Sequence, residues 1–219
     1  MNKLKFLSVT AILVGYSAFT GITPALAGSQ AHAHIGHVIS SWKDTPSERG
    51  FLPTAFKESL VAAAHANYAV NAAGNLEAMK VHASHVRHAI DPTLEDGGPG
   101  LGYGLIKAVE GAVKHITLAS ETGDASMAVK AHTVHIVASL NATIVRSTAA
   151  LVAADAIIAA TDATVALEYA VEMAALTKTA LSGVDVNGDG EISWSEDEGG
   201  LKVADKHIGF ILKAEGLKR

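Results

Sequence analysis

The chain has 219 residues, with 17 lysines and arginines against 22 aspartates and glutamates, and a formal net charge of −5. An acidic chain lacks the surplus of positive charge with which proteins hold a phosphate backbone, so nucleic acid is excluded as an expected partner. The sequence has no cysteine, which excludes disulfides, thiolate metal sites and covalent haem attachment.

The first 27 residues have the three parts of a secretory signal peptide. Lys3 and Lys5 give a positive start, residues 6–19 are largely apolar, and residues 25–27 read Ala-Leu-Ala, a small-x-small cleavage site. We therefore expect a periplasmic or secreted protein whose mature chain begins at Gly28 and has no membrane contact. A retained N-terminal anchor is the alternative, but the apolar stretch is short for a span of about 20 residues.

The remainder of the chain predicts an all-α helical bundle. Alanine is abundant, and apolar residues recur at spacings of three and four, which is the period of an amphipathic helix. The long apolar run at 136–160 contains Arg146 and Asp155, so it is predicted to be a buried bundle helix and not a membrane span. In chain order the expected helices are 31–43, 54–72, 76–90, 104–121, 125–160, 163–181 and 201–213.

Two helical hairpins are predicted to repeat each other at an offset of 50 residues. At this offset the histidines of the first copy, His65, His82 and His85, fall on His115, His132 and His135. We therefore divide the mature chain into a His-bearing bundle at 28–160, with repeats at 50–99 and 100–149, and a C-terminal segment at 161–219.

The repeated histidines are candidate ligands for a transition metal. His82 and His85 are three residues apart and share one helix face. His65 lies as far before the predicted turn near Gly74 as this pair lies after it, so the three rings are expected at one level of an antiparallel hairpin. The second copy predicts the same convergence of His115 with His132 and His135. Three imidazoles suit zinc or copper.

Other histidines give weaker signals. Met79 and His88 extend the stripe of His82 and His85, and a thioether beside imidazoles would favour copper. The N-terminal residues His32, His34 and His37 are expected to be a polar helix start, with a flexible chelating arm as the alternative, and His207 is uninformative alone. Histidines on alanine-rich helices are also often surface residues that bind nothing.

A family resemblance accompanies these histidines. The segment Gly104-Leu-Ile-Lys-Ala-Val-Glu-Gly-Ala-Val-Lys-His115, followed by Lys130-Ala-His132, resembles the small metal-binding proteins of ammonia-oxidising bacteria, which are periplasmic His-rich helical bundles. The resemblance covers residues 55–140, and it implies scavenging of divalent metals.

A twelve-residue stretch near the C-terminus places oxygen ligands at the positions of an EF-hand calcium loop. Gly190 stands at position 6, where the chain turns sharply. The stretch resembles the EF-hand family, and the resemblance implies an EF-hand-like helix-loop-helix that binds calcium through Asp185, Asn187, Asp189, Glu191, Ser193 and Glu196.

This calcium loop departs from the family pattern after its last ligand. Gly199 and Gly200 fall early in the exit helix, and because glycine disfavours helix, we expect that helix to start late, at about residue 201. A single loop of this kind outside the cytoplasm is expected to act as a weak stabilising clamp with a dissociation constant of about 0.1 to 1 mM.

The sequence thus predicts an exported calcium-binding protein that also binds a transition metal through its repeated histidines. It is not expected to be an enzyme, because Glu-x-x-His, His-Glu-x-x-His and Gly-x-Ser-x-Gly motifs are missing from the sequence. The alternatives are a bundle that binds haem non-covalently between two histidines, and a metalloenzyme with a three-His centre. The protein partner and the oligomeric state are left open.

Overall fold

The computed structural model describes residues 29–219, so the predicted signal peptide lies outside the described residues. Helices account for 72% of this part of the chain, which holds no strand, and the prediction of an all-α bundle is confirmed. Two short 3₁₀ helices, at Pro46–Glu48 and Pro92–Leu94, interrupt the loops. The α-helices are α1 (Gln30–Ile39), α2 (Phe51–Asn71), α3 (Leu76–Ile90), α4 (Leu105–Glu121), α5 (Met127–Ala159), α6 (Ala163–Ser182) and α7 (Leu201–Glu215).

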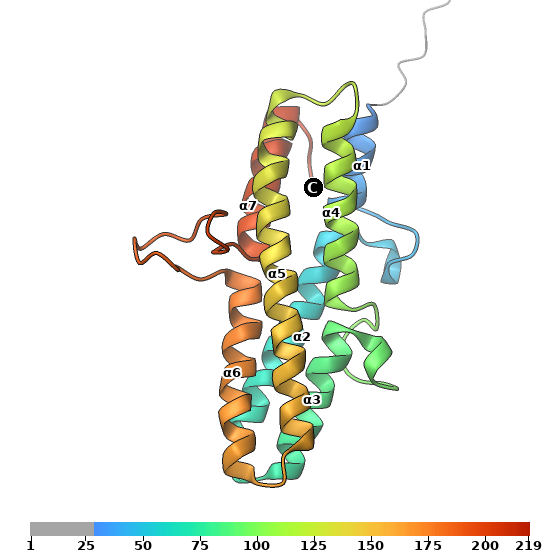
Figure 1. Ribbon diagram of the computed structural model, residues 1–219. Coiled ribbons are helices and arrows are strands. Elements are labelled where there is room, and N and C mark those ends of the chain that lie inside the picture. The colour runs from blue at the N-terminus through green and yellow to red at the C-terminus, as the bar shows by residue number, and fades with distance from the viewer. Residues whose placement is uncertain (1–28) are drawn as a thin grey trace, which may run out of the picture.

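Helix α5 is the spine of the molecule and runs along the whole length of the bundle (Figure 1). It contains 33 residues, which corresponds to about 50 Å of helix. Helices α4 and α7 pack along its first half, and α3 and α6 pack along its second half. Helix α1 lies outside α4, and α2 lies behind the spine against α3, α4 and α6.

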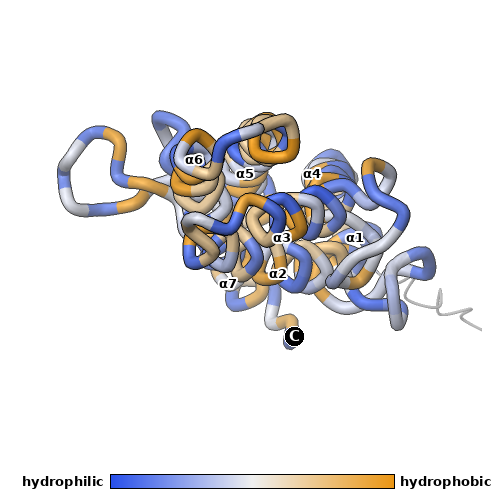
Figure 2. Tube along the Cα trace, turned by 90° about the horizontal axis from the view of Figure 1, so that it is seen from below, coloured by the Kyte–Doolittle hydropathy of each residue, from blue (hydrophilic) through white to orange (hydrophobic). Residues whose placement is uncertain are grey.

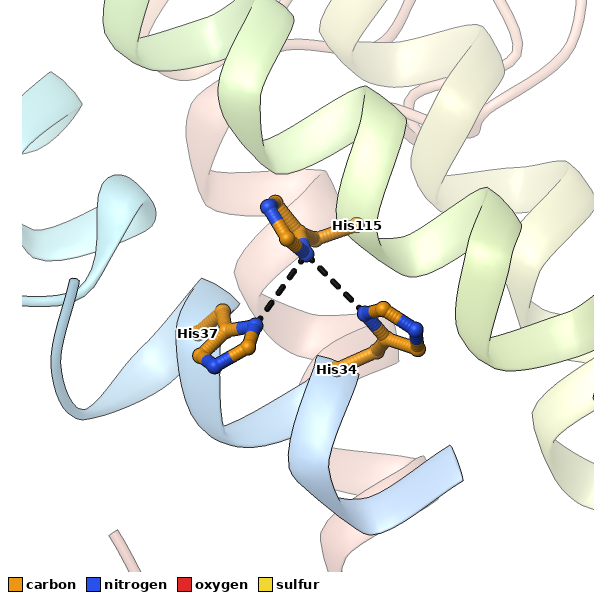
Figure 3. Close-up of side chains that lie close together, drawn as sticks. All are labelled: His34, His37 and His115. Atoms are coloured by element: carbon orange, nitrogen blue, oxygen red, sulfur yellow. Dashed lines mark hydrogen bonds between the residues drawn. The ribbon is translucent and has the colours of Figure 1, made fainter. Parts of the chain in front are cut away.

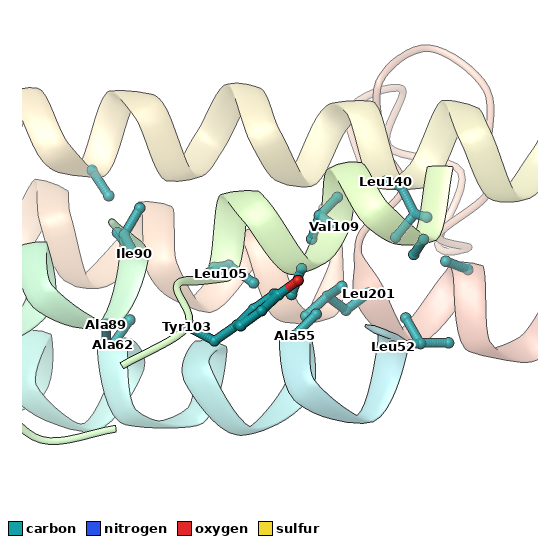
Figure 4. Packing of buried hydrophobic residues seen from close by; sticks show 14 of the residues in the cluster. Leu52, Ala55, Ala62, Ala89, Ile90, Tyr103, Leu105, Val109, Leu140 and Leu201 are labelled. Atoms are coloured by element: carbon teal, nitrogen blue, oxygen red, sulfur yellow. The ribbon is translucent and has the colours of Figure 1, made fainter. Parts of the chain in front are cut away.

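One continuous core joins all seven α-helices. Alanine fills many buried positions of α2, among them Ala55, Ala62, Ala66 and Ala69, each with no exposed surface. Small side chains let helix backbones approach closely, and larger residues such as Leu105 and Leu140 fill the space between them (Figure 4). Viewed along the bundle, apolar residues also appear on the outer side of α5 and α6 (Figure 2).

Helix α5 is the one described helix that is long and apolar enough, by length and composition, to cross a membrane. Its buried residues belong to the core, and the helix packs against four others. Arg146, in its middle, donates hydrogen bonds to the backbone carbonyls of Asp197 and Gly199. These contacts agree with the predicted role of a bundle helix.

The helix boundaries follow the capping residues. Asn75, Ser126 and Asp162 each accept a hydrogen bond from a backbone N–H in the first turn of α3, α5 and α6, which satisfies donors that a helix leaves unpaired at its start. Helix α3 has its predicted bounds, and α7 begins at Leu201, as the pair of glycines before it predicts. Helix α1 ends at Ile39, four residues earlier than expected.

A buried glutamate shapes the connection between α3 and α4. Glu58 on α2 has no exposed surface, and its carboxylate accepts hydrogen bonds from the backbone N–H groups of Leu101, Tyr103 and Gly104 at 2.9–3.0 Å. The loop is therefore held against α2 by the oxygens of one side chain, and this contact fixes where α4 begins.

Candidate metal centres

Nine of the histidines form three separate clusters, each able to hold a metal ion. Site one contains His34, His37 and His115; site two contains His65, His82 and His85; site three contains His132, His135 and His207. Within each site, one nitrogen from each ring lies within 4.8 Å of the other two. Among residues 29–219, no carboxylate is part of these clusters.

Each site is built from two helices in the same way. One helix supplies a His-x-x-His pair, and these helices are α1, α3 and α5; the other supplies a single histidine, and these are α4, α2 and α7. The three-residue spacing places both rings of a pair on one helix face. The chain therefore alternates between pair and single histidine from α1 to α5, and the last single histidine follows on α7.

The ring geometry is nearly the same in the three sites. The first ring of each pair makes interplanar angles of 41°, 42° and 45° with the single histidine. The second ring makes angles of 83°, 78° and 71°. Such agreement across three helix pairs indicates three copies of one arrangement and not three chance contacts.

The Nδ1 atoms point inward in every site, as Figure 3 shows for site one. The single histidine's Nδ1 lies 3.0–3.2 Å from the Nδ1 atoms of both pair members. A neutral imidazole carries one N–H and one lone pair. The Nδ1 atom of the single histidine therefore has only one proton or one lone pair to share between its two contacts, and neither contact becomes a full hydrogen bond. With the protons on Nε2, three lone pairs converge on one point.

The spacing of these atoms suits a small ion. Metal–nitrogen bonds of about 2.0–2.1 Å at tetrahedral or trigonal angles separate the donor atoms by about 3.3–3.6 Å. The separations of 3.0–3.2 Å between the single histidine and each pair member need to open by only a few tenths of an ångström, and all three donor atoms of a site lie within 4.8 Å of one another. Small rotations of the rings would bring these distances to those of a bound ion.

The single histidine of each site is held in its neutral, ligating form. Burial, with smaller contributions from the neighbouring histidines and from the adjacent Lys114 and Lys206, lowers the pKa of His115 and of His207 to about 4. Burial is also the main cause of the lowered pKa of His65, with contributions from its two partners. All three single histidines are thus uncharged near neutral pH, when their lone pairs are free.

Aromatic rings stand beside every site. Trp42 lies 4.8 Å from His37 and 4.7 Å from His115, between ring centroids. Phe51 stacks on His115 at 5.4 Å and packs against α4 at Gly111, where a Cβ would come within 2.3 Å of its ring. Aromatic side chains therefore cover one side of site one.

The same kind of boundary recurs at the other two sites. Tyr68 lies 5.3 Å from His65, and Phe210 lies 5.2 Å from His132. Trp194, from the loop before α7, stacks on His135 at 4.1 Å and 18°. Site three thus takes one of its aromatic rings from the segment that carries the calcium-loop motif.

Helix α1, which carries the pair of site one, is fixed at its N-terminus by the loop between α4 and α5. The Asp124 carboxylate accepts hydrogen bonds from the backbone N–H groups of Gln30 and Ala31, at 2.8 and 3.3 Å. Hydrogen bonds from Thr122 and Ser29 are the largest causes that lower the pKa of Asp124 to about 2. This residue therefore stays ionised and holds α1 beside α4.

A second contact holds the same helix to α7. His32 Nε2 lies 2.8 Å from Glu215 Oε2, and Ser126 also hydrogen-bonds this carboxylate. Beside site one, a pocket of about 290 Å³ is lined by His37, Ser41, Trp42, Lys43 and Glu48. Of the three histidines of site one, His37 lines this pocket.

The structure brings together the first predicted triad and separates the second. His65, His82 and His85 converge as expected. His115 does not meet His132 and His135: it turns toward α1, and that pair turns toward α7. The sequence spacing predicts the level of a residue along a helix, but the direction in which its ring points depends on helix rotation, at about 100° per residue.

His34, His37 and His207 are therefore ligand candidates that the sequence interpretation missed. His34 and His37 do lie on the first helix, as predicted, but they also converge with His115, which was not predicted. His207 forms a cluster only because α7 packs against α5. The sequence does contain a signal for the missed pair: buried residues stand next to each histidine of the pair in all three copies, at Ile35 and Val38, Ala83 and Val86, and Thr133 and Ile136.

The repeat at an offset of 50 residues recurs in the packing. Buried residues of α2 and α3, namely Ala62, Ala66, Ala69, Met79, Ala83 and Val86, fall on buried residues of α4 and α5, namely Ala112, Ile116, Ala119, Val129, Thr133 and Ile136. Met79 is a fully buried residue of the hydrophobic core, and the buried His88 belongs to none of the clusters. The thioether argument for copper therefore does not apply here.

The predicted calcium loop stands out from the bundle between α6 and α7 (Figure 1). The Asp185 carboxylate accepts hydrogen bonds from the N–H groups of Gly188 and Gly190, at 2.7 and 2.9 Å, and Gly190 has a φ of +89°. Asn187 and Asp189 each accept one from the residue two positions on. The first half of the loop is thus tightly turned, with Gly190 at the bend.

The second half of the loop closes on Glu198. This glutamate has no exposed surface, and it accepts hydrogen bonds from the N–H groups of Val186, Asn187 and Ser193 at 2.9–3.4 Å. Glu196, the predicted twelfth-position ligand, is exposed and has a φ of +52°. Within residues 29–219, the groups in which three or more candidate ligand atoms lie close together consist of histidines alone. The acidic residues of this loop do not form such a group.

The chain was compared with known protein families, curated proteins and solved structures. No protein-family model, no curated protein and no solved structure matches it. The three clusters therefore have to be interpreted from their own chemistry.

Proposed function

We propose that this is an exported protein that binds transition-metal ions, one at each of its three trihistidine sites. The observation that carries the proposal is that two Nδ1 atoms of a His-x-x-His pair lie 3.0–3.2 Å from the Nδ1 atom of a single histidine in three separate helix pairs. Export follows from the signal-like residues 1–27. Imidazole nitrogen favours zinc and copper among the common metals.

The cost of the clusters supports a binding role. The single histidine of each site shares one Nδ1 atom between two contacts, so one proton or one lone pair has to serve both. Burial is the main cause that lowers the pKa of His115 and His207 to about 4, so these rings are neutral near pH 7 and offer a lone pair to a ligand. A bound cation would replace the two strained ring contacts of each site with three ligand bonds.

The chemistry of the sites favours an ion over the two alternatives. A haem held between two histidines needs a flat macrocycle between the rings, and Nδ1 atoms about 3 Å apart leave no space for one. A metalloenzyme needs a base close to its open position, and none of the three clusters in residues 29–219 includes a carboxylate. Binding, buffering or delivery of the metal is the function we favour.

Elemental analysis of the purified protein tests the proposal. After loading and dialysis, we expect three transition-metal ions per chain, and two after each of the substitutions His65→Ala, His115→Ala and His207→Ala. The triple variant should retain none, whereas the control His88→Ala should retain three. A triple variant that still holds three ions would overturn the proposal.

Calcium binding is a second candidate function. The turn at Gly190 and the inward hydrogen bonds of Asp185 favour it, because they give the loop the bend that an EF-hand loop needs. Titration calorimetry should show one calcium ion per chain, bound with a dissociation constant of about 0.1 to 1 mM. Asp185→Ala should remove it. If the parent protein binds no calcium at millimolar concentration, this second function is refuted.

A further inference from the structure

The donor set of the three sites is uncharged. Each site offers three imidazole nitrogens, and none of the carboxylates in residues 29–219 lies within a cluster. Protein zinc sites usually complete four ligands, with thiolate, carboxylate or water beside histidine. A divalent ion placed here would keep its full double charge in a half-buried setting, and burying uncompensated charge is costly.

The charged side chains next to the ligand histidines are mainly positive, so they do not offset the charge of a bound cation. Lys114 precedes His115 and Lys206 precedes His207, and each lowers the pKa of its histidine through its charge. At site two, the acid that acts on His85 is Glu95, and Glu95 is itself paired with Arg87 at 2.8 Å. At site one, the pocket beside His37 is lined by Glu48 and by Lys43, whose charges oppose each other. The described surroundings therefore give little net compensation for a doubly charged ion.

The next neighbours of the ligand rings are carbon surfaces. Trp42 touches two histidines of site one, Tyr68 touches two of site two, and Phe210 touches two of site three. Aromatic faces attract cations but do not supply the oxygen donor that a fourth coordination position requires. Such a site suits a singly charged ion that binds three nitrogen ligands and needs no fourth ligand.

We infer that the three sites hold copper as the monovalent cuprous ion, in preference to zinc or to divalent copper. Cuprous copper has a closed d shell and accepts three-coordinate nitrogen environments, and its single charge halves the charge to be buried. This inference rests on the proposed metal-binding function. It specifies the ion that the same sites select.

Paired competition titrations under anaerobic conditions test the inference. Copper(I) would be buffered by a bathocuproine chelator and zinc by a chromophoric zinc chelator. We expect three equivalents of copper(I), each with three nitrogen neighbours in X-ray absorption spectra, and zinc binding at least 100-fold weaker at each site. Zinc binding as tight as copper(I), or bound copper that is divalent with added oxygen ligands, would overturn the preference.

Charge reversal gives a sharper control. Lys114 and Lys206 are exposed, so Lys114→Glu and Lys206→Glu should leave the fold intact. Each should raise zinc affinity relative to copper(I) at its own site by at least threefold, with site two unchanged. If neither variant changes the ratio, the charge argument is refuted. A protein that binds neither ion in stoichiometric amount would instead refute the proposed function itself.

Discussion

The pairing of His115 with α1 can be tested with the two tryptophans of the chain. The sequence contains two tryptophans, and they report on different sites: Trp42 lies 4.7 Å from His115 in site one, and Trp194 lies 4.1 Å from His135 in site three. In Trp194→Phe the emission therefore follows site one, and in Trp42→Phe it follows site three. We predict that His115→Ala weakens metal binding at site one alone.

The size of the effect follows from the number of ligands. Four-ligand structural zinc sites bind with about 10–16 kcal/mol, so one ligand contributes about 2.5–4 kcal/mol, or a factor of about 10²–10³ in affinity. His115 supplies one of three donors and contacts both others through Nδ1. Its loss should therefore shift the Trp42 titration midpoint by about that factor.

The assay is a metal titration followed by tryptophan emission in the two single-tryptophan backgrounds. His115→Ala should leave the Trp194 midpoint within about twofold, and His207→Ala should give the opposite result. His88→Ala is the matched control, because His88 is a buried histidine outside every cluster. If His115→Ala instead weakens binding at Trp194, His115 belongs with His132 and His135, and the helix pairing described here is wrong.

Three further predictions concern single features of the fold. Trp194→Ala removes the ring stacked on His135 and should weaken site three by about tenfold, as for other groups that support ligands; competition titration that shows equal weakening at site one would contradict this. Burial holds the pKa of His115 and His207 at about 4 in the folded protein, below the ordinary 6.5, so the unfolded chain binds protons first and the metal-free protein should lose stability as pH falls from 6.5 to 4. Urea unfolding across this range should show a smaller loss in the double variant His115→Asn/His207→Asn, and an equally steep loss would refute the assignment. Glu58→Gln leaves backbone donors facing an amide NH₂ and should lower the free energy of unfolding by about 2–4 kcal/mol in urea titrations; a change below about 0.5 kcal/mol would show that the buried carboxylate does not hold the loop.

The helices were predictable because their signals are local. Apolar spacing and the caps at Asn75, Ser126 and Asp162 depend on neighbours within one or two turns. Glycine pairs also act locally, which is why the late start of α7 at Leu201 could be expected. Site two was predictable for a related reason, since its three histidines lie on consecutive helices joined by a short turn.

Sites one and three were not predictable from chain order. His34 and His115 are separated by α2 and α3, and His132 and His207 are separated by α6. Only the packed bundle determines which faces of α1, α4, α5 and α7 meet. The role of Glu198 in closing the loop was equally hidden, because the motif directs attention to Glu196, two residues earlier.

The most direct test of the central claim is a crystal structure of the metal-loaded protein, with data collected at the absorption edge of the bound metal. Our account predicts three anomalous peaks, one in each trihistidine site, each about 2.0–2.1 Å from three Nδ1 atoms. Peaks away from these clusters, or ions held by one or two histidines only, would contradict it.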